Sequence, residues 1–218
     1  TYTAAGFYTV TLTVTDNDGG VHTTSKQISV QVSSSNSEIS NPTVTLTLDG
    51  NLSDWNGLRS FGLDPDDVTG INNKLDWLEG WMAHDENNFY IAYRNEGPID
   101  INNWWGWQIY IDADNNPATG YQLGAIGAEY HIEENMVRKY TGNGDSWSWQ
   151  DQGKSASAVN GNVVELRFPQ AWLGEPVTLN LAFYGENVAF SGGTTEDYYP
   201  DGLLQEQASV RFFRYNAN

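Results

Sequence analysis

Short segments in which apolar and polar residues alternate recur through most of this chain. Alternation with a period of two is typical of β-strands, because successive side chains point to opposite faces of a sheet. Such segments are WLEGWMAHD (77–85), NFYIAYR (88–94), WGWQIYID (105–112), EYHIEE (129–134), MVRKYTG (136–142), WSWQDQG (147–153), NVVELRFP (162–169), VTLNLAFYG (177–185) and ASVRFFRY (208–215). About ten short strands without a long helical pattern predict an all-β fold, an antiparallel β-sandwich of the immunoglobulin or jelly-roll kind. The one helical signal is a single turn at 169–175, which Pro169 opens.

The first 33 residues form a separate pattern. Val10, Leu12 and Val14 alternate with threonines, residues 16–20 (DNDGG) make a turn, and a second alternating strand follows. This pattern predicts a β-hairpin, which is marginal in water by itself and needs a packing partner. A polar stretch at 34–42 is typical of a linker. We therefore predict a hairpin at 1–33, a linker at 34–42 and the sandwich at 43–218.

Charge and composition exclude several classes of protein. The chain has 28 acidic against 10 basic residues, a formal net charge of −18, which disfavours binding to nucleic acids and to anionic membranes. No apolar run is long enough to cross a bilayer, and cysteine is absent, so disulfides and thiolate metal sites are excluded. The sequence shows no signal peptide, and we expect a mature chain or a fragment.

Aromatic residues are concentrated around the segment NNWWGWQIYID (102–112). If this segment is a strand, its two faces differ in character. One face is apolar and is predicted to be core: Trp105, Trp107, Ile109 and Ile111. The other face is mixed and is predicted to lie at a surface: Trp104, Gln108, Tyr110 and Asp112.

Sugar rings stack on exposed indole faces, while their hydroxyls bond to nearby amides, carboxylates and guanidinium groups. Trp147 and Trp149 are two residues apart and should share a strand face, as should Trp77 and Trp81. For any single tryptophan, core packing is the simpler interpretation, yet a set of nine favours at least two that face a ligand. The candidate sugar-binding residues are Trp104, Trp147, Trp149, Trp77 and Trp81, with Gln108 and Arg94 as polar partners.

The turn after this strand has oxygen-bearing side chains at alternate positions, Asp112, Asp114 and Asn116. Calcium takes six to eight oxygen ligands, and this D-x-D-x-N spacing lets one turn supply three of them. The turn is not an EF-hand, since it lacks the glycine and the glutamate of that loop. A solvated Asx turn without metal explains the same residues.

Two stretches resemble known families. The segment GFYTVTLTVTDNDGG with the strand after it resembles the last two strands of a polycystic-kidney-disease (PKD) domain, an immunoglobulin-like spacer. Seven segments follow one another later in the chain: LDGNLSDW, AHDENNFYIAYRNEG, WWGWQIYIDADNNPATGY, GAEYHIEE, YTGNGDSWSWQ, VVELRFP and DYYPDG. Together, and in this order, they resemble DOMON-like β-sandwiches related to family 9 carbohydrate-binding modules.

The second resemblance covers roughly residues 43–215. It implies a non-catalytic sugar-binding module with structural calcium, and Glu129 of GAEY as a further metal ligand. It also implies a secreted bacterial protein, in which the module would attach a catalytic domain of the same parent chain to polysaccharide.

Three other functions are weaker alternatives. Catalysis is disfavoured because Glu133 and Glu134 are adjacent in a strand and point to opposite faces, and no nucleophile elbow, P-loop or HExxH motif is present. Some DOMON relatives bind haem through Met and His, for which Met82, His84 and His131 are the candidates. A structural or adhesive module is the third alternative, since an incomplete first domain would expose strand edges.

Overall fold

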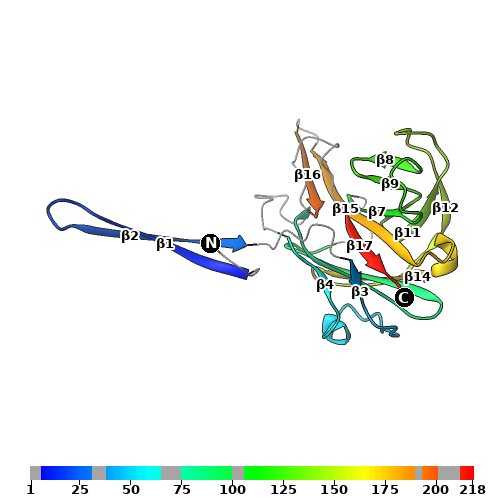
Figure 1. Cartoon of the computed structure of the whole chain (residues 1–218), viewed down its shortest axis with the longest axis horizontal. Helices are drawn as coiled ribbons and strands as arrows, with labels where there is room; N and C mark the ends of the chain where they lie inside the picture. The colour runs from blue at the N-terminus through cyan, green and yellow to red at the C-terminus, as the bar shows by residue number, and fades with distance from the viewer. Residues whose placement is uncertain (1–5, 31–37, 65–74, 100–105, 190–192, 201–211) are drawn as a thin grey trace. The chain divides into compact units, whose positions relative to one another are not determined.

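In a computed structural model of the chain, the described residues are 6–30, 38–64, 75–99, 106–189, 193–200 and 212–218. The chain divides into two compact units, Thr1–Ser35 and Asn36–Asn218. Within the described ranges the regular structure is β-strand with short 3₁₀ turns, and no α-helix occurs (Figure 1). No helix in these ranges has the length and apolar character to cross a membrane. The predicted all-β fold is confirmed.

The first unit contains the predicted hairpin. Strand β1 (Gly6–Thr15) pairs antiparallel with β2 (Val21–Val30) in continuous register. Asp16 closes the turn, because its carboxylate accepts hydrogen bonds from the backbone N–H groups of Asp18 and Gly20. The apolar side chains of Val10, Leu12, Val14 and Val21 are exposed.

The second unit has two main sheets, which are the layers of the sandwich. The larger sheet is antiparallel except where β17 and β3 run parallel. In spatial order it contains β12 (Trp149–Lys154), β11 (Met136–Tyr140), β10 (Tyr130–Glu133), β7 (Trp107–Asp112), β15 (Thr178–Ala189), β17 (Phe213–Asn216) and β3 (Ile39–Ser40), and β16 (Gly193–Tyr199) also pairs with β15.

The smaller sheet is fully antiparallel. In spatial order it contains β13 (Ala156–Asn160), β14 (Val163–Pro169), β6 (Asn88–Asn95), β5 (Trp77–His84) and β4 (Ser60–Leu63). The 3₁₀ turn Gln170–Leu173 follows β14 and confirms the predicted single turn. Pro169 precedes it and Gly174 ends it in the left-handed conformation (φ 80°), which glycine adopts without strain.

The main core lies between the two sheets and takes alternate residues from each. On β7 the inward row includes Trp107, Ile109 and Ile111, as the alternation predicts. Each buried side chain of this size contributes roughly 1.5–3 kcal/mol to stability. Further core members are Met82 and Ile91 on the smaller sheet and Leu181 and Phe183 on the larger one.

Each sheet also has an outer face, and a further segment packs on it. On the smaller sheet, residues 44–58 with the 3₁₀ turn Leu52–Trp55 cover a second apolar cluster that includes Trp55 and Trp81. On the larger sheet, a small hairpin of β8 (Tyr121–Leu123) and β9 (Ile126–Ala128) covers part of the outer face of β7 and β15. The uncovered remainder of that outer face positions the candidate site.

A β-bulge in β5 corrects one prediction. The register between β5 and β6 shifts between Trp77 and Glu79, so the strand has one extra residue there. Trp77 therefore points into the main core, where it is fully buried, whereas Trp81 belongs to the outer cluster. The two tryptophans do not share a face.

The predicted linker, 34–42, extends too far into the second unit. Ile39 is buried and Ile39–Ser40 forms a strand beside β17. The Asn41 side chain is also buried, and its amide nitrogen donates to the carbonyl oxygens of Arg59 and Met82. These residues therefore belong to the sandwich.

Candidate functional site

A pocket of about 650 Å³ lies on the outer face of the larger sheet. Strands β7, β8, β10, β15 and β16 and the loop before β12 supply its walls. We call it the aromatic pocket; its lining residues are Gln108, Tyr110, Tyr121, Leu123, Glu133, Trp147, Tyr184, Glu186, Glu196 and Tyr198.

Strand register explains why these residues meet. Residues directly opposite each other in antiparallel strands place their side chains on the same face. Gln108 lies opposite Glu133 on one side and Tyr184 on the other, and Tyr184 in turn lies opposite Tyr198. Four adjacent strands thus contribute one row of polar and aromatic side chains to the pocket.

Trp147 supplies the exposed aromatic surface of the site. Trp147 lies in the loop before β12 and is 56% exposed. Its ring lies edge-on to three neighbouring rings, with centroid distances of 5.6 Å to Tyr121, 5.2 Å to His131 and 5.6 Å to Trp149. These contacts hold the indole in place while much of it stays open to a ligand.

Gln108 is a buried amide whose orientation is fixed. Its Oε1 accepts a 2.6 Å hydrogen bond from the Tyr110 hydroxyl and lies 3.2 Å from His131 Nε2. Because an amide oxygen only accepts, His131 Nε2 carries the proton of that bond. No described residue accepts a hydrogen bond from the Gln108 amide nitrogen, so its N–H donors are available to a ligand in the pocket that Gln108 lines.

His131 is fully buried beneath the aromatic rings. Burial, and then the nearby charge of Arg138, lowers the pKa of His131 to about 3. The imidazole is therefore neutral at physiological pH. Its ring stacks on Tyr110 at a centroid distance of 5.0 Å, so it supports the pocket from below.

Glu186 and Glu196 form an acidic wall on the β15 and β16 side of the pocket. They lie opposite each other in the strand register. The Tyr184 hydroxyl lies within hydrogen-bond distance of both carboxylates, at 2.7 Å from Glu186 Oε2 and 3.1 Å from Glu196 Oε1. Burial, followed by the charges of these two glutamates, raises the pKa of Tyr198 to about 12.

A second hollow of about 440 Å³ adjoins the aromatic pocket, and we call it the side pocket. Glu133 and Trp147 line both hollows, so Trp147 stands between them. Its other lining residues are Arg138, Ser148 and Trp149. Arg138 forms ion pairs with Glu133 and Asp151, which neutralise the charge of Glu133.

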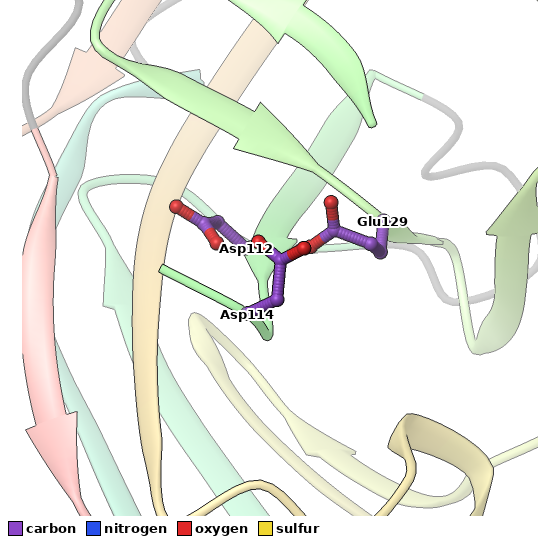
Figure 2. A group of neighbouring side chains, drawn as sticks. All are labelled: Asp112, Asp114 and Glu129. Atoms are coloured by element: carbon purple, nitrogen blue, oxygen red, sulfur yellow. The ribbon is translucent and has the colours of Figure 1, made fainter. Parts of the chain in front are cut away.

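Asp112, Asp114 and Glu129 form a separate carboxylate group at the end of β7 (Figure 2). One oxygen of each lies within 4.8 Å of the others. Glu129 precedes β10, and the pairing of Tyr130 with Ile111 places it beside Asp112. The group could hold a metal ion.

The environment of this carboxylate group fits a cation. None of the three residues forms an ion pair with a described Lys, Arg or His side chain. Burial is the largest cause that raises the pKa of Asp112 and of Glu129, because ionised carboxylates are costly there without a counter-charge. The side-chain oxygen of the predicted ligand Asn116 accepts a hydrogen bond from the backbone N–H of Ala118.

The structure brings together only part of the predicted sugar-binding set. Gln108 and Trp147 line the aromatic pocket, and Trp149 lies beside them in the side pocket. Trp104 lies outside the described residues. The remaining predicted residues, Trp77, Trp81 and Arg94, lie elsewhere.

Trp77 and Trp81 are buried on the smaller sheet, so neither offers a ring to a ligand at the pocket. Arg94 lies on β6 of the same sheet and pairs with Glu79 at 3.5 Å. It is on a different sheet from Gln108 and lines neither pocket.

The sequence analysis missed the residues that β15 and β16 contribute. Tyr184 and Glu186 continue the outward row of β15, opposite to the inward row of Leu181 and Phe183. That alternation is visible in the sequence, but it does not indicate that the outward face of the strand lies at a ligand site. The outward position of Tyr198 and Glu196 depends on pairing with β15, which no local pattern reveals.

Of the three candidate haem ligands, Met82 and His84 are two residues apart on β5, and His131 lies apart from both. Met82 is buried in the core between the sheets, and His84 bonds to the Tyr215 hydroxyl through Nδ1 at 2.8 Å. His131 lies instead under the aromatic pocket, on the outer face of the larger sheet.

No protein-family model matches this chain, and no curated protein is significantly similar to it. The resemblances to DOMON-like and PKD domains therefore stay predictions. What the chain can do follows from the aromatic pocket and from the carboxylate group at the end of β7.

Proposed function

We propose that Asn36–Asn218 is a non-catalytic glycan-binding module and that the aromatic pocket is its sugar site. The observation that carries this proposal is the exposed indole of Trp147 beside a buried amide and an acidic wall in one hollow. An indole face stacks on the C–H patches of a sugar ring. Gln108 donates to ring hydroxyls and the glutamates accept from them. The volume, about 650 Å³, is in the range of pockets that enclose small ligands.

The arrangement of carboxylates favours binding over hydrolysis. Glycosidases place two carboxyl groups on either side of the bond that breaks. Here Glu186 and Glu196 lie on one wall and share the Tyr184 hydroxyl, and the third carboxylate of the pocket, Glu133, is paired with Arg138. Binding by such a module raises the local concentration of a catalytic domain in the same secreted parent chain at its polysaccharide.

Replacing Trp147 with alanine tests the sugar site. We expect Trp147→Ala to weaken glycan binding by about 1–3 kcal/mol without loss of stability, because the side chain is half exposed and contacts the ligand. Trp149→Ala should weaken binding less, since Trp149 lines only the side pocket. Isothermal titration against a panel of soluble oligosaccharides measures the affinity.

Two tryptophans provide matched controls. Trp172→Ala removes an indole outside both pockets and should leave binding unchanged. Trp77→Ala opens a core cavity and should lower the free energy of unfolding by about 3–5 kcal/mol. Equal glycan affinity in Trp147→Ala and the parent protein would contradict the proposed site.

We further propose that the group of Asp112, Asp114 and Glu129 binds calcium. Three carboxylates with backbone carbonyls and water supply the all-oxygen shell that calcium takes. The ion would fix the turn after β7, at the end of the strand that carries Gln108. It has no role in contacting the sugar.

Removal of the ion tests this assignment. An ion that binds only the folded chain adds about 2.7 kcal/mol at a concentration 100 times its dissociation constant. EDTA should therefore lower the melting temperature, and added Ca²⁺ should restore it. Asp114→Asn, which keeps the size of the exposed side chain, should abolish the difference. Identical melting curves with EDTA and with Ca²⁺ in the parent protein would disprove calcium binding.

A further inference from the structure

The acidic wall lacks a positive partner within the part of the chain that the structure describes. Glu186 and Glu196 are neighbours across β15 and β16, and no described Lys, Arg or His forms an ion pair with either. The lining of the aromatic pocket contains three glutamates and no basic residue. The guanidinium of Arg138, which pairs with the pocket residue Glu133, is engaged by Glu133 and Asp151.

A single phenol holds the two carboxylates of the wall together. The Tyr184 hydroxyl lies within hydrogen-bond distance of both, but it has one proton and can donate to only one at a time. Among the described residues, the two adjacent negative charges therefore share one neutral donor. A ligand group with several N–H donors and a positive charge would satisfy both oxygens together.

The rings beside the wall favour the same kind of group. The Tyr184 and Tyr198 rings lie 4.8 Å apart between their centroids, next to the two glutamates. The faces of aromatic rings attract cations, and this attraction increases where water is excluded. A neutral hydroxyl gains little from this second interaction, whereas an ammonium group gains from both the carboxylates and the rings.

We propose that the aromatic pocket selects saccharides that carry a free, protonated amino group, which the acidic wall of Glu186 and Glu196 binds. This proposal rests on the proposed glycan-binding function and specifies its ligand class. Trp147 stacks on the sugar ring, Gln108 donates to a hydroxyl, and the ammonium group donates to both glutamates. Uronic acid and sulfated saccharides are rejected, because the wall and the net charge of −18 repel them.

Titration with matched oligosaccharides tests the ligand class. The ligands are tetramers of β-linked glucosamine, N-acetylglucosamine, glucose and glucuronic acid, at low salt and slightly acidic pH. We expect the glucosamine tetramer to bind on the order of tenfold more tightly than the two neutral tetramers, since charge-assisted hydrogen bonds are the stronger ones. The uronic acid tetramer should not bind. The preference should decrease as salt concentration rises.

Isosteric variants test whether the acidic wall causes the preference for the amino sugar. Glu186→Gln and Glu196→Gln keep the size of the side chains and one accepting oxygen, and each should reduce affinity for the glucosamine tetramer by a larger factor than affinity for the neutral tetramers. Glu175→Gln, an exposed acid outside the pocket, is the control and should change nothing. Thermal melting verifies that each variant is folded.

The outcomes separate this inference from the proposed function. Equal affinities for the amino and neutral tetramers, with both lost in Trp147→Ala, would overturn the ligand class and retain the sugar site. An amino-sugar preference that survives both glutamine variants would also overturn the inference. Absence of binding to every saccharide would overturn the proposed function itself.

Discussion

At the scale of single residues, His131 links the stability of the fold to the shape of the aromatic pocket. Its ring contacts both indoles, with centroid distances of 5.2 Å to Trp147 and 5.0 Å to Trp149. The imidazole is buried and neutral, so it packs between the aromatic rings and also donates a hydrogen bond to Gln108. A positive charge at this position would be unfavourable beside Arg138.

The depressed pKa of His131 predicts a loss of stability in acid. The unfolded chain binds a proton near the ordinary pKa of 6.5, while the folded chain binds it only near 3. Between these values the unfolded state holds more protons, so the free energy of unfolding decreases as the pH falls, by about 1.4 kcal/mol per pH unit for this group.

His131→Gln removes this titration but keeps a polar side chain of similar reach. We expect the variant to lose less stability than the parent protein between pH 6.5 and pH 4.5. Urea unfolding at several pH values measures the difference. Parallel pH profiles for the two proteins would show that His131 is not the group responsible.

At the scale of elements, the turn after β7 brings together the carboxylates of the proposed ion site. Asp112 is buried and accepts a 3.0 Å hydrogen bond from Asn180, which ties the turn to β15. Asp114 is exposed and accepts from the backbone of Asn116 and from Thr119. The turn is therefore organised by its own hydrogen bonds, and an ion would neutralise the charge gathered there.

The raised pKa values of Asp112 and Glu129 predict how this turn responds to pH. Without metal, protonation relieves buried charge, so these groups stabilise the folded state as the pH falls through their raised pKa values. Calcium needs the ionised forms, so protons compete with it at a higher pH than for ordinary carboxylates. The increase in melting temperature caused by Ca²⁺ should shrink from pH 7 to pH 5. An increase that stays constant over this range would contradict the assignment.

Element-scale patterns also show which features a sequence can predict. Alternation along 107–112 correctly separates the inward row of β7 from the row that carries Gln108, because this depends on strand geometry alone. The second row does not lie at a surface as predicted: Gln108, Tyr110 and Asp112 are buried, and β8 and β9 pack over part of that face. The same rule fails between Trp77 and Trp81, since one extra residue in the bulge reverses the faces. Arg94 was misplaced for another reason: a local pattern does not indicate to which sheet a strand belongs.

The candidate site shows the same limit. Asp112, Asp114 and Trp147 were found because their spacing or their type is unusual. Tyr198 and Glu196 were not found, because their place in the pocket depends on the pairing of β16 with β15, which is a contact between different strands. The resemblance to a known family, not the spacing, supplied Glu129.

At the scale of the whole molecule, the chain consists of two units with separate packing. The described hairpin of the first unit exposes Leu12 and Val21, and its hydrogen bonds are local. The second unit contains the three apolar clusters, the aromatic pocket and the carboxylate group.

We therefore predict that residues 36–218 alone retain the stability and the glycan binding of the full chain. The melting temperature should change by less than about 2 °C, which corresponds to less than about 1 kcal/mol for a domain of this size. Calorimetry of the two proteins and titration with the same oligosaccharide measure this. A larger decrease on removal of residues 1–35 would show that the hairpin stabilises the sandwich.

The separation of the apolar clusters has a consequence for divergence among related sequences. The tyrosines of the aromatic pocket pack in a cluster on the outer face of the larger sheet, while the sandwich is held by another cluster between the sheets. Substitutions at Trp147, Tyr184 or Glu196 change the proposed ligand surface and leave the inner cluster intact. Descendants of this sequence can thus acquire new ligand preferences on an unchanged scaffold, and selection can act on recognition and on folding almost independently.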